Sequence, residues 1–77
     1  MEYDVKTFGR NMRIRRAALG ISQTKLAEKS GISDTTLCQY ELGNHTPNLA
    51  SAIKIANALE ISLDALLDAD TFGKFGR

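Results

Sequence analysis

Four residues near the middle of the chain have short or amide-bearing side chains suited to contacting nucleic-acid bases: Asp34, Thr35, Cys38 and Gln39. Among them, Leu37 and Tyr40 lie three residues apart, as apolar residues do on one face of a helix. A helix here turns Leu37 and Tyr40 inward and leaves the other four on or near its outer face. Glutamine can pair with an adenine edge, threonine can touch a thymine methyl, and aspartate can accept from cytosine N4. We therefore predict a base-contacting face, with Asp34 its least favourable member because its charge repels phosphate.

A repeated helix-start signal places this helix and two others. The string Ile-Ser-x-x-x-Leu begins at positions 21, 32 and 61. In each copy, the serine hydroxyl can accept a hydrogen bond from a backbone N–H of the first helical turn. The isoleucine before it and the leucine four residues after it can meet across the helix entry as a hydrophobic staple. The unequal spacing argues against a solenoid. We predict helices that begin at Ser22, Ser33 and Ser62, with a sharp turn at Gly31.

Two further helices complete the pattern. Asp4 can cap a helix over residues 4–19, which Gly20 ends, and its apolar residues lie near helical spacing: Val5, Phe8, Met12 and Leu19. Asn48, after Pro47, can cap another, whose predicted apolar stripe is Leu49, Ala52, Ile53, Ala56 and Leu59. No alternating β-branched run favours a strand. The prediction is an all-α, compact five-helix bundle in one domain, residues 1–77, with a helix-turn-helix at about 22–42 and a short tail at 69–77.

Composition excludes several functional classes. The chain has one histidine, one cysteine, no paired carboxylate cluster and no glycine-rich phosphate loop, so we expect neither an enzyme nor a metal or cofactor site. No apolar run approaches a membrane span, and no leader sequence opens the chain. The single Cys38 cannot form an internal disulfide, which suits a reducing compartment. We therefore expect a cytoplasmic protein without membrane contact.

Charge is distributed unevenly along the chain. Residues 1–29 carry seven basic and three acidic side chains, whereas residues 30–77 carry three basic and six acidic ones. A basic first half favours one side that faces phosphate. The alternative is an ordinary solvated helix face, which the charge pattern alone favours.

These residues carry a family resemblance. The segment ISQTKLAEKSGISDTTLCQYELGN at 21–44, followed by Pro47-Asn48 and LEISLDALL at 59–67, resembles the phage repressor/Cro class of helix-turn-helix transcriptional regulators, often called Xre-like. The similarity runs from about residue 8 to residue 67. It implies a five-helix bundle of the phage repressor type that binds double-stranded DNA as a homodimer.

The resemblance also implies roles for individual residues. Asp34, Thr35 and Gln39 would contact bases, with Cys38 beside them. Gln23 would hydrogen-bond a phosphate and brace the third helix, and Arg16 would form an ion pair with Glu41. The side chains expected at the DNA backbone are Arg13, Ser22, Gln23, Thr36, Asn44 and His45.

Two departures from the family pattern bear on binding. Arg15 stands where leucine is usual, so the aliphatic part of its side chain would take the place of the leucine's apolar contact. Leu42-Gly-Asn-His replaces a more basic stretch, which predicts fewer phosphate contacts and a shallower salt dependence. The leucines of the fifth helix fit either the core or a dimer surface, and Phe72 and Phe75 in the tail either fray or dock.

Two functional hypotheses follow. The first is a sequence-specific DNA-binding transcriptional regulator, a repressor of phage, plasmid or mobile-element type that binds a near-palindromic operator through the major groove. The second is an antitoxin or another protein-interaction module of the same fold, which masks a partner such as a toxin. The observations that favour this second hypothesis are the acidic second half of the chain and the two phenylalanines of its tail.

Overall fold

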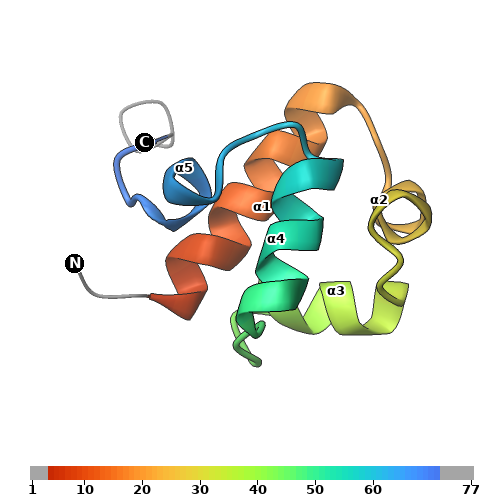
Figure 1. The fold of residues 1–77 in the computed structure, drawn as a ribbon, viewed down its shortest axis with the longest axis horizontal. Coiled ribbons are helices and arrows are strands. Elements are labelled where there is room, and N and C mark those ends of the chain that lie inside the picture. Colours follow the sequence, from red (N-terminus) through yellow and green to blue (C-terminus); the bar gives the residue numbers. More distant parts are fainter. Residues whose placement is uncertain (1–3, 72–77) are drawn as a thin grey trace.

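The computed structural model describes residues 4–71, and these fold into five helices without a strand. The helices are α1 (Val5–Leu19), α2 (Gln23–Ser30), α3 (Asp34–Leu42), α4 (Leu49–Ala58) and α5 (Leu63–Leu67). In Figure 1, α4 stands in front of α1, α3 runs along the lower edge, and α2 is seen end-on beside them. The predicted all-α five-helix bundle is confirmed. Among these five, no helix has the length and apolar character needed to cross a membrane.

Local capping decides where each helix begins and ends. Every helix starts at its predicted cap, whose side chain accepts a hydrogen bond from a backbone N–H of the first turn: Asp4, Ser22, Ser33, Asn48 and Ser62. The N–H of Lys6 is the main cause that lowers the pKa of Asp4. Three helices end at a glycine with φ between 70° and 76°, a left-handed conformation that strains other residues: Gly20, Gly31 and Gly43.

The core is formed by seven large apolar side chains with no exposed surface: Phe8, Met12, Leu26, Leu37, Ile55, Leu59 and Leu66. The isoleucines of all three helix-start signals pack against it, as the staple predicts: Ile21, Ile32 and Ile61. The predicted stripe of α4 is wrong at two positions, because Leu49 is 67% and Ile53 43% exposed. Ile55 takes their place, since α4 turns the side bearing Ala52, Ile55 and Ala56 towards the core.

The leucines of α5 divide between core and surface. Leu66 is fully buried, whereas Leu63 and Leu67 are half-buried. The half-buried pair lines an apolar hollow with Pro47, Leu49 and Ala52. The predicted alternatives for Phe72 and Phe75 lie outside the described residues.

Polar side chains of α1 hold the ends of α4 and α5. Arg15 Nε donates to Leu59 O at 2.9 Å and Arg15 Nη2 to Glu60 O at 3.2 Å, where the chain leaves α4. The buried Asn11 Nδ2 donates to Leu66 O at 2.8 Å and to Asp68 O at 3.0 Å. These bonds satisfy carbonyls that a helix end leaves without partners. Arg15, at the position where the resemblance implies a leucine, therefore makes a helix-end contact.

Candidate nucleic-acid interface

The third helix is seated against α1 at very close range. A Cβ atom added at Gly9 would overlap the carbonyl oxygen of Tyr40 and lie 2.8 Å from that of Glu41. Only glycine allows this approach, so the backbone of α3 rests directly on α1. Leu37 and Tyr40 are buried, as predicted, and anchor the inner face of α3 in the core.

A carboxylate at the end of α3 ties three helices together. Glu41 Oε2 accepts from Arg16 Nε at 2.8 Å, and Oε1 accepts from Arg16 Nη2 and Gln23 Nε2, each at 3.1 Å. The Glu41 side chain is only 6% exposed, and its hydrogen bonds are the main cause that raises the pKa of Arg16. The ion pair implied by the resemblance is therefore present, in a two-bond geometry. Gln23, at the start of α2, contacts the same carboxylate and so holds α3 in place.

The outer face of α3 carries the four candidate base-contacting residues. Asp34 and Thr35 are exposed, and Cys38 and Gln39 are half-buried. One hollow on this side is lined by Gln23, Asp34, Thr35, Cys38 and Gln39. A second is lined by Thr35, Thr36, Gln39, Tyr40, His45 and Thr46. Thr35 and Gln39 border both hollows and therefore form a crest between them, which we call the α3 crest.

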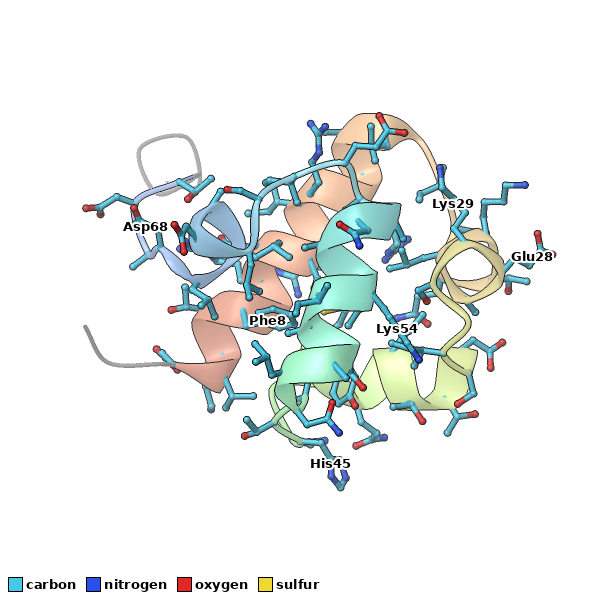
Figure 2. The ribbon with its side chains drawn as sticks, viewed as in Figure 1. Phe8, Glu28, Lys29, His45, Lys54 and Asp68 are labelled. Carbon is cyan, nitrogen blue, oxygen red and sulfur yellow. The ribbon has the colours of Figure 1, made fainter. Side chains whose placement is uncertain are left out.

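The residues predicted at the DNA backbone surround this crest in different ways. Ser22 is exposed, and its hydroxyl caps α2. Thr36 Oγ1 accepts from Ser33 Oγ at 2.9 Å. His45 is exposed and points away from the body of the molecule (Figure 2). Asn44 has a partner that sequence reasoning missed, because its Nδ2 donates to Gln39 Oε1 at 3.1 Å.

One side of α1 faces α3, and it carries a basic residue, Lys6, that sequence reasoning missed as a candidate. Gly9 and Arg16 both contact α3, and Arg13 lies four residues from the first and three from the second. Arg13 is therefore on the α3 side of α1, and it is exposed. Lys6 lies on the same side, since a Cβ at Gly43 would lie 2.9 Å from Lys6 Cγ. The spacing 6, 9, 13, 16 is the sequence signal that places Lys6 there.

Most basic side chains of the first half have partners within the described residues. Arg10 Nη2 donates to Ala69 O at 2.8 Å, and Arg15 and Arg16 have the partners given above. Lys25 Nζ lies 3.6 Å from Glu28 Oε1, and Lys29 Nζ lies 3.8 Å from Glu60 Oε2. Within residues 4–71, Arg13 makes neither an ion pair nor a side-chain hydrogen bond. Most of these basic side chains are therefore engaged within the chain, and the uneven charge by itself does not indicate a phosphate-facing side.

The crest presents hydrogen-bonding groups at the surface of the molecule. In the described part of the chain, no group of three or more His, Cys, Asp or Glu side chains is placed to hold a metal ion. The side chains gathered on the α3 crest are hydrogen-bonding groups that stand between two hollows of the surface. Such a crest can recognise donors and acceptors on another surface.

Comparison with known proteins identifies the family of the chain. A helix-turn-helix family model matches residues 12–66. The chain is 42% identical over 52 residues to the cryptic phage CTXphi transcriptional repressor RstR of Vibrio cholerae, covering 68% of this chain and 46% of that protein. It is 34% identical over 64 residues to the uncharacterized HTH-type transcriptional regulator YqaE of Bacillus subtilis, covering 83% and 55%. The chain thus spans about half the length of these curated relatives.

Solved structures show the same fold. The restriction-modification controller protein C.AhdI from Aeromonas hydrophila has a TM-score of 0.78 at 35% identity, covering 82% of this chain and 96% of that one. The P22 c2 repressor in complex with a synthetic operator has a TM-score of 0.76 at 33% identity, covering 82% and 96%. These proteins are named as transcriptional regulators, repressors or a controller protein. The chain belongs to the helix-turn-helix family of phage repressor/Cro (Xre-like) type.

Proposed function

We propose that this chain is a sequence-specific double-stranded DNA-binding transcriptional regulator that acts as a repressor. The observation that carries the proposal is the α3 crest, where Thr35 and Gln39 stand between two hollows while Leu37 and Glu41 anchor the opposite side of the helix. The major groove of B-DNA admits an α-helix, and its base edges present distinct donors and acceptors. The crest can therefore lie in the groove without any rearrangement of the core.

Contacts to the DNA backbone would flank the crest. Ser22 and Gln23 lie at the N-terminus of α2, where exposed backbone N–H groups favour an anion. Gln23 already donates one N–H to Glu41, and its amide carries a second that can reach a phosphate. Thr36 and His45 border the hollow on the other side of the crest. Lys6 and Arg13 add positive charge from α1, next to α3.

Two copies would bind together on a near-palindromic operator. One α3 helix covers few base pairs, and a dimer places two such helices about 34 Å apart in successive major grooves. The exposed Leu49 and the hollow it forms with Leu63 and Leu67 support contact between copies, since clustered apolar surface favours association. Occupation of the operator by such a dimer would exclude RNA polymerase in the cytoplasm.

Selection of bound sites from random duplex DNA tests the proposal. We expect an inverted repeat whose half-sites lie about one helical turn apart. Gln39→Ala should cost about 1–3 kcal/mol on the selected site and relax the choice at one base pair of each half-site. Asn57→Ala, at an exposed position of α4, is the matched control and should keep full discrimination. Recovery of no preferred sequence, or unchanged discrimination by Gln39→Ala, would refute the proposal.

A further inference from the structure

The end of α3 fixes the position of Asn44 relative to Gln39. Gly43 has a left-handed φ of 76°, and its N–H donates to Tyr40 O at 3.0 Å. The N–H of Asn44 donates to Gln39 O, also at 3.0 Å. This pair of bonds is a Schellman motif, which sets the second residue after the helix against the residue five positions before it. The main chain alone therefore brings Asn44 beside Gln39.

The two side chains use this placement for a hydrogen bond. Asn44 Nδ2 donates to Gln39 Oε1 at 3.1 Å, in place of the hydrophobic contact that often accompanies the motif. The carbonyl oxygen of Gln39 is thereby turned towards the loop after α3. Its Nε2 group, which carries two N–H donors, is left on the outer side of the amide.

We propose that Asn44 is a positioning residue that determines base specificity, by making Gln39 a hydrogen-bond donor that favours guanine over adenine. The proposal rests on the proposed function, in which the α3 crest lies in the major groove. Guanine presents two acceptors there, N7 and O6, and both accept from an amide nitrogen. Adenine presents one acceptor and one amino donor, and the usual paired contact with glutamine needs the carbonyl oxygen turned to the base edge, whereas the bond from Asn44 turns it towards the loop.

The experiment compares base preference at the pair that Gln39 contacts. That pair is the one at which Gln39→Ala loses discrimination in the selected site. Competition between duplexes that differ only there should show wild-type protein preferring guanine over adenine by roughly 5- to 100-fold. Asn44→Ala frees the amide to adopt either orientation, so the ratio should fall towards one.

Asn44→Asp should reverse the orientation of the Gln39 side-chain amide. An aspartate can only accept, so Gln39 must donate its nitrogen to it and turn its oxygen to the groove. The preference should then move from guanine to a base with an amino donor, adenine or cytosine. The ratio between two duplexes cancels the uniform loss of affinity that an added negative charge causes. Asn57→Ala and Asn57→Asp make the same changes at an exposed position of α4 and should keep the wild-type ratio.

The outcomes separate this inference from the proposed function. Wild-type preference for adenine at the Gln39-dependent pair would overturn the inference, as would an unchanged ratio in both Asn44 variants. The proposed function would stand in either case, because Gln39→Ala would still alter discrimination. Thermal melting followed by circular dichroism should be unchanged in the Asn44 variants, since the main-chain bonds of the motif remain.

Discussion

Glu41 is the residue on which the geometry of the interface most depends. One buried carboxylate accepts two bonds from Arg16 on α1 and one from Gln23 on α2. Because it lies at the end of α3, any movement of α3 away from α1 or α2 would break a charged hydrogen bond. The carboxylate has almost no contact with water, so the loss of its partners would leave a buried charge uncompensated.

Arg16→Ala should therefore destabilise the protein far more than loss of a surface ion pair. We expect a decrease of about 3 kcal/mol in the free energy of unfolding, the lower end for a broken buried pair, because Arg16 keeps some exposure. Urea unfolding followed by circular dichroism measures it. The double variant Arg16→Met/Glu41→Leu removes both charges and should recover most of the loss. A decrease below about 1 kcal/mol for Arg16→Ala, as in exposed pairs, would contradict this account.

Among the helices, α1 both supports α3 and holds the ends of α4 and α5, and its sequence pattern only partly predicts these contacts. One side supports α3 through Gly9 and Arg16, and its polar side chains hold the ends of α4 and α5 through Arg15 and Asn11. Glycine within a helix costs about 1 kcal/mol relative to alanine. At Gly9 that cost is offset by close contact with the backbone of α3.

Gly9→Ala should thus destabilise the protein although alanine is the better helix former. The added methyl group would overlap backbone carbonyl oxygens, which cannot rotate away as a flexible side chain can. We expect a loss of about 1–3 kcal/mol in the free energy of unfolding, typical of overpacking, together with weaker DNA binding as α3 shifts. Ala18→Gly, at an exposed position of α1, measures the propensity effect alone. A gain in stability from Gly9→Ala would show that α1 and α3 are farther apart than described.

Sequence reasoning predicted what is local and missed what depends on packing. All five caps and the glycine turns follow from short-range hydrogen bonding and backbone sterics, so the helices begin where expected. The predicted stripe of α4 is right at Ala52, Ala56 and Leu59 and wrong at Leu49 and Ile53. Its pattern allows either Ile53 or Ile55 to face inward, and only the neighbouring helices decide. The close approach at Gly9 and the Asn44–Gln39 bond bring together residues whose relation needs the folded backbone.

For the molecule as a whole, net charge is a poor guide to its affinity for DNA. Among the arginines of α1, Arg10, Arg15 and Arg16 donate to groups of the chain itself, and Arg13 alone has no side-chain partner within residues 4–71. Two lysines of α2 have carboxylate partners. Among residues 4–71, the cations beside α3 that have no partner within this part of the chain are Lys6 and Arg13. Recognition should depend mainly on uncharged groups, namely backbone N–H, hydroxyl and amide donors.

The salt dependence of binding should consequently be shallow. Each phosphate neutralised by a cationic side chain contributes about −0.9 to the slope of log K against log salt concentration. Two such contacts predict a slope of about −2 per protomer. Arg13→Ala should reduce it by about one unit and weaken binding to the selected site and to unrelated duplex alike. Lys54→Ala changes an exposed lysine of α4 that lines a separate hollow with Lys29, and it should leave the slope unaltered. Fluorescence anisotropy titrations across a salt series measure all three proteins. A much steeper slope would mean that arginines now bound to backbone carbonyls leave them for phosphates, and a loss confined to the selected site would assign Arg13 to a base.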